Sequence, residues 1–251
     1  FGGVVQARAR RGRGAPPPAR RASAAHGTAQ GAAALGLGDE AAWLDLQASH
    51  LETDGIDSCR GLPFPPGGGC FTREPDRDPY RNTSANLRGG WQVLPGLAAQ
   101  AFVQHTAGRA HYDGSFVNES RTVNQVAGVE VEGQPAERWR TRLVAGRSWD
   151  DNESFRDGAS RSVFDSRRDT LTWQNDLDFG ARGSLVLGLD WLQDRVASTT
   201  DYDRGSRWNR AAFAQYGMAL GRHELSVSAR VDDNQQFGSH ALPFGAENPG
   251  Q

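Results

Sequence analysis

The sequence is poor in several kinds of residue, and each shortage argues against a class of protein. It holds two cysteines and one methionine, and every residue of the Lys/Arg class is arginine. With so few cysteines and no histidine pair at zinc-ligand spacing, a zinc site is not expected. No apolar run approaches the roughly 20 residues that a membrane-spanning helix needs, which excludes a helical membrane protein. The mean hydropathy is -0.63 and the net charge is -2, so we expect no nucleic-acid partner.

The first 21 residues are rich in arginine, glycine, alanine and proline. Taken alone, such a stretch could bind nucleic acid or anionic lipid, but we interpret it as a solvated linker. The chain begins without an initiator methionine or a signal peptide, and we expect it to be a fragment of a longer protein.

Apolar and polar residues alternate over most of the remaining chain. In the segment 184–191, for example, leucines and a tryptophan at odd positions alternate with Ser184, Gly188 and Asp190. Strict alternation is typical of a strand with one apolar and one wet face, and helical spacing is nowhere sustained. We count about eleven strands by this criterion. The clearest are in 44–48, 85–93, 123–131, 139–145, 171–179, 185–191 and 225–231.

The connections alternate in length. Short Gly- or Pro-bearing turns are expected at 38–40, 95–96, 133–135, 180–183 and 221–222, and long polar loops at 52–79, 108–120, 150–166 and 194–206. This order places every long loop at one end of the sheet, which is typical of an antiparallel transmembrane β-barrel. Five tryptophans near expected strand ends could form an aromatic girdle: Trp91, Trp139, Trp149, Trp191 and Trp208. The alternative is a secreted, calcium-dependent glycan-binding β-sandwich, in which the same alternation would come from ordinary core packing.

Two acidic loops are the candidate site. The first, 53–80, carries five carboxylates and a Pro/Gly-rich excursion between Cys59 and Cys70, for which we predict a disulfide. The second contains Asp113, with Asn118 and Glu119 just after it. Massed carboxylates repel one another unless a cation lies between them, and calcium takes six to eight oxygen ligands. If the long loops share one end, the two acidic loops can face each other and hold calcium.

Catalysis is not expected. Paired carboxylates on a β-scaffold could serve a glycosidase, but here the acids are massed in loops rather than placed singly on strands. The sequence has no G-x-S-x-G motif, and its six histidines show no ligand spacing. We therefore expect a protein that is not an enzyme.

Four phrases give the chain a resemblance to a known family. They are FGGVV at the start, CFTREPDRDPYRNTSANL and HYDGSFVNES in the two acidic loops, and ARVDDNQQFGSH late in the chain. They resemble TonB-dependent outer-membrane receptors of Gram-negative bacteria, and among them the cobalamin transporters. The resemblance implies a plugged barrel of about 22 strands. Residues 1–14 would be the end of the plug and a linker, and residues 15–251 the N-terminal half of the barrel.

The resemblance also implies ligands and partners. A calcium cage would be formed by Asp57, Glu74, Asp76, Asp78, Tyr112, Asp113, Gly114 and Asn118, with Glu119 able to replace Asn118. A weaker match in the segment 162–164 places Val163 at a ligand contact. The expected cofactor is calcium, and the expected ligand is cobalamin or another corrinoid. The expected partners are outer-membrane lipid and the TonB-ExbB-ExbD energising complex, which would act through the plug. A siderophore or haem is the alternative ligand.

Overall fold

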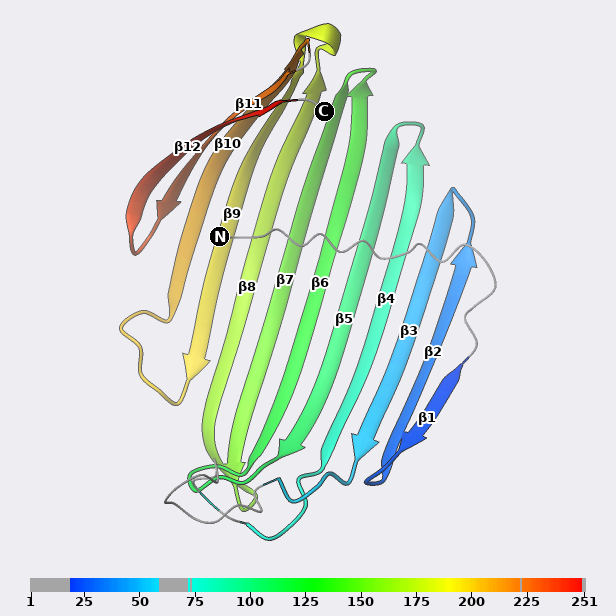
Figure 1. Cartoon of the computed structure of the whole chain (residues 1–251), viewed down its shortest axis with the longest axis vertical. Helices are drawn as coiled ribbons and strands as arrows, with labels where there is room; N and C mark the ends of the chain where they lie inside the picture. The colour runs from blue at the N-terminus through cyan, green and yellow to red at the C-terminus, as the bar shows by residue number, and fades with distance from the viewer. Residues whose placement is uncertain (1–18, 59–71, 73, 222, 250–251) are drawn as a thin grey trace.

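A computed structural model describes residues 19–58, 72, 74–221 and 223–249. Twelve strands form one antiparallel sheet in which each strand pairs with its neighbours in sequence (Figure 1). Their bounds are β1 Arg20–Ala24, β2 Thr28–Gly38, β3 Ala42–Thr53, β4 Tyr80–Leu94, β5 Leu97–His111, β6 Glu119–Ala136, β7 Trp139–Arg156, β8 Ala159–Asp178, β9 Ser184–Ser198, β10 Ser206–Leu220, β11 His223–Asn234 and β12 Gly238–Pro249.

The predicted all-β, antiparallel architecture is confirmed, with one strand more than the count expected from alternation. Strand β1 begins at Arg20, inside the arginine-rich stretch that the sequence predicts to be a linker. In the described part of the chain, helical structure is confined to the 3-10 turn Gly180–Arg182, and no helix there is long and apolar enough to cross a membrane.

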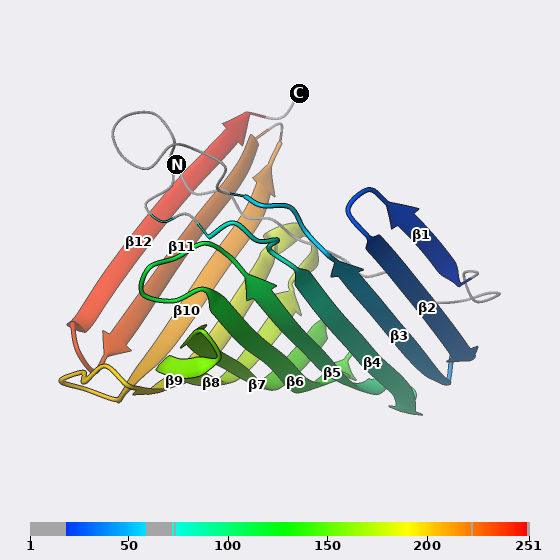
Figure 2. The same cartoon turned by 90° about the horizontal axis from the view of Figure 1, so that it is seen from below.

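The sheet is bent into an open trough (Figure 2), and Figure 1 looks into its concave side. One face carries exposed apolar side chains, such as Leu171 at 42% and Leu189 at 51% exposure. We call this face the outer face and the opposite one the inner face. Among the described residues only Phe155 and Ala211 are buried apolar side chains. A β-sandwich buries its apolar face against a second sheet. The described residues form a single sheet, so the sandwich alternative is wrong.

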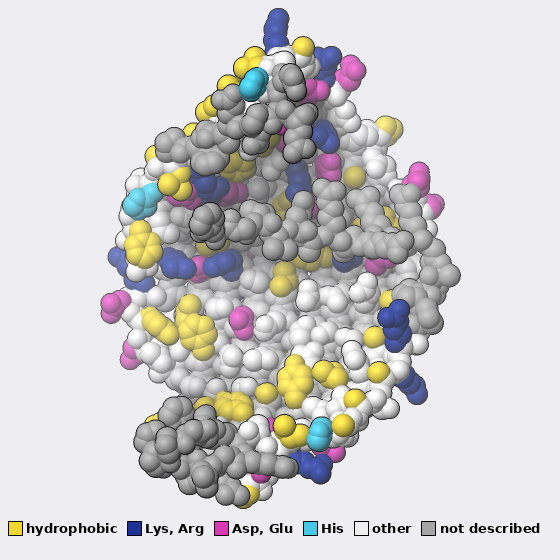
Figure 3. Space-filling model, in the orientation of Figure 1, with side chains coloured by type: hydrophobic (Ala, Val, Ile, Leu, Met, Phe, Trp, Pro, Cys, Tyr) yellow, Lys and Arg dark blue, Asp and Glu magenta, His cyan; other side chains and the backbone are white. Residues whose placement is uncertain are grey.

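Register places the five candidate girdle tryptophans on the outer face. Trp139 pairs with Leu177 and Trp191 pairs with Leu171, and directly opposed residues point to the same side of a sheet. Trp91 and Trp139 lie toward one end of the strands, and Trp149 and Trp208 toward the other, whereas Trp191 lies at the midpoint of β9. The concave side, seen in Figure 3, shows charged side chains of both signs and scattered hydrophobic side chains among uncharged polar side chains and backbone.

The two ends of the sheet differ as predicted. Short turns join β2 to β3, β4 to β5, β6 to β7, β8 to β9 and β10 to β11 at one end, which we call the short-turn end. The three long connections, which join β3 to β4, β5 to β6 and β9 to β10, all leave and re-enter the sheet at the opposite, long-loop end (Figure 1). This end also carries tight turns at 25–27, 157–158 and 235–237.

One predicted loop is wrong. The segment 150–166 is a hairpin rather than a loop, because β7 and β8 stay paired up to a two-residue turn at Asp157 and Gly158. Both residues have positive φ, 50° and 79°, as the hairpin-closing Asp-Gly turn requires. Here polar residues dominate both faces, and the few apolar residues Phe155, Val163 and Phe164 do not alternate with them, although the backbone pairing continues. The turn expected at 133–135 also lies later, because β6 continues to Ala136.

Candidate functional site

The two acidic loops meet at the long-loop end of the sheet. The first joins β3 to β4 and the second joins β5 to β6, and these strands are neighbours. The amide of His111 donates to the carbonyl of Pro79 at 3.0 Å, which ties the base of the second loop to the end of the first. As a result, carboxylate oxygens of Asp76, Asp78 and Asp113 lie within 4.8 Å of one another.

The negative charge of Asp113 is the least compensated in this group of three carboxylates. Both of its carboxylate oxygens are buried and have no hydrogen-bond partner among the described residues. Burial raises the pKa of the Asp113 carboxyl, and the negative charges of Asp78, Asp57, Glu74 and Asp76 raise it further. A buried carboxylate among other carboxylates is costly unless a cation or a proton neutralises it. The donor set is all oxygen, which fits calcium rather than a softer metal.

Two glycines allow the close backbone approaches that shape the acidic loops. Gly55 has a φ of 68°, and a Cβ there would lie 1.9 Å from the carbonyl oxygen of Asp78. A Cβ on Gly114 would lie 2.0 Å from the carbonyl oxygen of Val117. Neither contact is sterically possible, so only glycine fits at these two positions.

Asp78 is held in place by the first loop itself. Its amide donates to the carbonyl of Ile56 at 3.0 Å. Its Oδ2 accepts from the Ser58 amide at 3.1 Å and also from the Ser58 hydroxyl. Sequence reasoning missed Ser58, because a single serine in a polar loop carries no periodic or spacing signal.

Glu74 is predicted in the same cage, but its nearest partner is a cation of the protein. Its Oε1 lies 2.5 Å from Nη1 of Arg156, at the end of β7. The same guanidinium donates to the carbonyl of Gly114 and lies 3.2 Å from Asp157. Arg156 therefore joins both acidic loops to the β7–β8 hairpin and offsets part of their negative charge. It too was missed, because the sequence predicts a loop at this position.

Asn118 is turned toward the hairpin and not toward the carboxylates. Its Nδ2 donates to Oδ1 of Asp157 at 3.0 Å, and its Oδ1 accepts from the Asp157 amide at 3.0 Å. Its amide and carbonyl bond to Phe155 and Tyr112. With its side-chain oxygen engaged in this way, Asn118 anchors the second loop. The adjacent Glu119 is also engaged, because it forms ion pairs with Arg109 and Arg121 at 2.7 and 3.0 Å.

The remaining predicted site residues fall into two groups. Cys59 and Cys70 lie outside the described residues, so the disulfide stays a prediction. Val163 lies within strand β8 rather than in a loop. Its amide donates to Oγ1 of Thr199 at 3.2 Å and its carbonyl accepts from the Thr199 amide at 3.0 Å, which joins β8 to the loop 199–205. Its assignment as a ligand contact stays a prediction.

The inner face is lined by cross-strand ion pairs. Asp194 on β9 lies between Arg168 and Arg207, at 2.6 and 3.1 Å. Arg230 on β11 pairs with Asp190 and Asp232, at 2.7 and 2.8 Å. Such networks tie neighbouring strands together side chain to side chain, and they make the concave surface polar and charged.

Comparison with known proteins gives similarity in fold. No family model matches the chain, and no curated protein matches it. A variant of the ferric enterobactin receptor from Pseudomonas aeruginosa matches with a TM-score of 0.70 and 13% identity, over 88% of this chain and 39% of that chain. The siderophore receptor PirA from the same organism matches with a TM-score of 0.68 and 17% identity, over 88% and 36%. The copper transporter OprC matches with a TM-score of 0.65 and 13% identity, over 91% and 41%.

The chain thus has the fold of part of these proteins and spans about two fifths of their length. At these identities the likeness concerns the fold alone.

Proposed function

We propose that the chain forms part of the barrel wall and the outer mouth of a TonB-dependent outer-membrane receptor that takes up a large metal-chelate nutrient. The observation that carries this proposal is the twelve-stranded sheet with all its long loops at one end, which has the fold of known siderophore receptors and a copper transporter. The strand edges at β1 and β12 would pair with further strands, because unpaired edges are not tolerated in lipid.

The dimensions of the outer face support a membrane location. On β7, Trp139 and Trp149 are ten positions apart on the same face. At about 3.3 Å per residue this is roughly 33 Å along the strand, or about 25 Å of membrane thickness at a tilt of about 40°. That equals the height of the apolar band of outer-membrane barrels, about 25 Å. We therefore assign the two tryptophan rows to the two membrane interfaces.

We further propose that calcium orders the mouth. The residues that would hold it are Asp76, Asp78 and Asp113, with Asp57 close enough to raise the pKa of Asp113. When bound, calcium would neutralise the carboxylates that repel one another in its absence. The loops would then be preorganised before the nutrient arrives, which lowers the ordering cost of binding.

A ferric siderophore is the first candidate ligand, because two of the similar structures are siderophore receptors. A corrinoid such as cobalamin is the second candidate. It is favoured by the sequence resemblance of the two acidic loops and by their approach in space. Import would be driven by the inner-membrane TonB complex acting on a plug, of which residues 1–14 would be the end.

Competition binding on the complete receptor in detergent tests the ligand class. The panel contains a ferric catecholate siderophore, cobalamin, haem and a copper complex, each with calcium and with chelator. We expect one metal chelate to bind and to bind more tightly with calcium. If no member of the panel binds, the receptor assignment fails, and if binding is equal with calcium and chelator, only the calcium role fails.

The double variant Asp76→Ala/Asp78→Ala should reproduce the effect of the chelator. A matched control is Asp201→Ala/Asp203→Ala, which removes two carboxylates from the loop 199–205 at the same end of the sheet. If the control weakens binding as much as the test variant, general surface charge explains the effect and the calcium site is wrong.

A further inference from the structure

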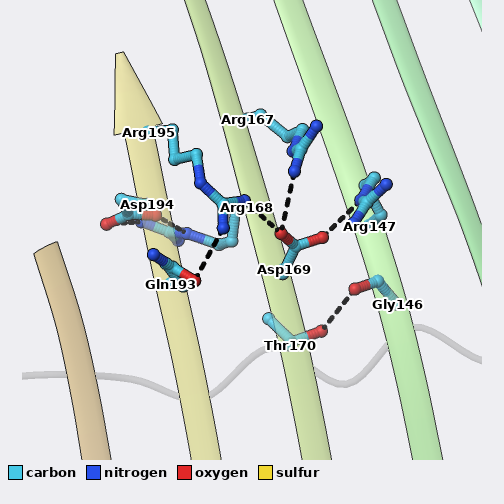
Figure 4. A network of polar contacts seen from close by, with 9 residues as sticks. All are labelled: Gly146, Arg147, Arg167, Arg168, Asp169, Thr170, Gln193, Asp194 and Arg195. Carbon is cyan, nitrogen blue, oxygen red and sulfur yellow. Dashed lines mark hydrogen bonds and ion pairs between the residues drawn. The ribbon is translucent and has the colours of Figure 1, made fainter. Parts of the chain in front are cut away.

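A cluster of arginines surrounds one carboxylate on the outer face, away from the acidic loops (Figure 4). Asp169 on β8 contacts Arg147 on β7 through Nε and lies 2.7 Å from Nη1 of Arg195 on β9. Nη2 of Arg167 is 3.6 Å from the same carboxylate. Three cations therefore share one anion, which leaves two positive charges in excess. We call these four residues the outer arginine cluster.

Register places the cluster on the lipid side of the sheet. Asp169 and Leu171 are two positions apart on β8, so they point to the same side. Figure 4 shows the cluster from the convex side of the sheet. Its strands keep the left-to-right order of Figure 1, but β9 points the opposite way, which requires that the sheet is seen from its other side. Arg168, between two members of the cluster in sequence, points to the inner face and pairs with Asp194.

The cluster sits at a defined depth. Toward the short-turn end it is followed by the apolar pair Leu171 and Trp191, which face each other across β8 and β9. Toward the long loops it is followed by the opposed acids Asp151 and Asp165. The arginines therefore lie in a narrow row where the apolar band ends, and the acidic row beyond them would repel an anion that moved outward.

Within the cluster, the single carboxylate of Asp169 is shared by three guanidinium groups. Arg167 and Arg195 are direct cross-strand partners, an arrangement in which like charges destabilise a sheet. Nε of Arg167 is buried and has no hydrogen-bond partner among the described residues. The three arginine side chains are still 37–42% exposed, so an anion can reach them. Arg147 also lies 5.7 Å from the ring of Trp149, an amphipathic residue suited to a membrane interface.

We infer that the outer arginine cluster binds the phosphate groups of an anionic lipid headgroup in the outer leaflet. Guanidinium groups bind phosphate through paired N–H donors, and the two excess charges match a phosphate monoester. The bound headgroup would relieve the repulsion between Arg167 and Arg195 and anchor the wall at the outer interface. This inference rests on the outer-membrane location proposed above.

The test is lipid binding by the complete receptor in detergent, measured by native mass spectrometry. The probes are lipid A with its two phosphates and the same lipid after dephosphorylation. Removing one arginine at an anionic surface costs on the order of fivefold in affinity, so Arg167→Gln/Arg195→Gln should weaken binding of the phosphorylated lipid roughly thirtyfold. The dephosphorylated lipid should bind the unchanged protein as weakly as the phosphorylated lipid binds the double variant.

The matched control is Arg168→Gln, which makes the same chemical change at the adjacent position on the inner face. It should leave lipid binding unchanged. Binding that is equal in the unchanged protein and the double variant, or an equal loss in the control, would overturn the inference. Nutrient binding by the double variant is measured in parallel. If nutrient binding is retained but lipid binding does not differ between the double variant and the unchanged protein, only the lipid site is wrong. If the complete protein stays soluble without detergent, the proposed function is wrong as well.

Discussion

Replacing Asp113 by asparagine should have opposite effects in the absence and in the presence of calcium. The substitution keeps the shape of the side chain and removes its charge. Without a cation, Asp113 is a buried carboxylate whose oxygens have no partner among the described residues, beside Asp76 and Asp78. Removing its charge should therefore stabilise the calcium-free loops, while the same change should weaken calcium binding.

The separation of the carboxylates sets the size of both effects. Two unit charges about 5 Å apart repel by about 1 kcal/mol in water and by about 3 kcal/mol at an effective dielectric constant of 20. Asp76 is exposed, so the lower part of this range applies to its pair with Asp113. Losing both repulsions should stabilise the calcium-free loops by about 2 kcal/mol. Losing one charged ligand should raise the calcium dissociation constant roughly ten- to a hundredfold.

Hydrogen exchange and calorimetry measure the two effects separately. Exchange of the amides of His111, Tyr112 and Asn118 reports the loop, because each of them donates to a backbone carbonyl. In chelator these amides should exchange more slowly in Asp113→Asn than in the unchanged protein. Calcium titration calorimetry gives the affinity, and Asp203→Asn is the control for charge loss at the same end of the sheet.

Two results would refute this reasoning. Equal calcium affinity in Asp113→Asn and the unchanged protein would mean that Asp113 is not a ligand. Faster exchange of the loop amides in chelator would mean that the Asp113 carboxylate stabilises the loop through a contact other than a cation.

Two further predictions concern the pH dependence of the acidic loops and the effect of new arginines on the two faces of the sheet. Because the pKa of Asp113 is raised, its contribution to the stability of the calcium-free loops is present at acid pH and is lost as the pH rises through that pKa. Calcium affinity should accordingly fall on acidification through the same pKa, and titration calorimetry at several pH values should show a flatter profile for Asp113→Asn. If the outer face meets lipid as proposed, Leu189→Arg should destabilise the complete protein in vesicles by about 2–4 kcal/mol, whereas Gln215→Arg on the inner face should be nearly neutral. Urea unfolding in vesicles measures both, and equal costs would contradict the assignment of the faces.

Much of the fold could be predicted from local pattern, because alternation within a strand is a local property of the sequence. The segment 184–191 alternates along its whole length, and it lies within strand β9. The alternation disappears where the strands extend beyond the apolar band. In 150–166 most residues on both faces are polar, so no regular alternation remains, and only the Asp157-Gly158 dipeptide signalled the hairpin that closes β7 and β8.

The candidate site was partly predictable for a related reason. Asp76, Asp78 and Asp113 belong to two acid-rich loops, and the alternation of short and long connections already places those loops at one end. The partners of the neighbouring residues were not predictable. Arg156 contacts Glu74, and Asn118 bonds to Asp157, only because the β7–β8 hairpin extends to the same height as the two loops.

The sequence by itself thus determined which side chains lie on the apolar outer face, which lie on the polar inner face, and which end of the sheet carries the loops. Only the tertiary structure decided which charged residues become neighbours. Arg147, Arg167 and Arg195 come from three different strands and meet around Asp169 because of the register between those strands. Register depends on where each turn closes, and a shift of one residue would move these side chains to the opposite face.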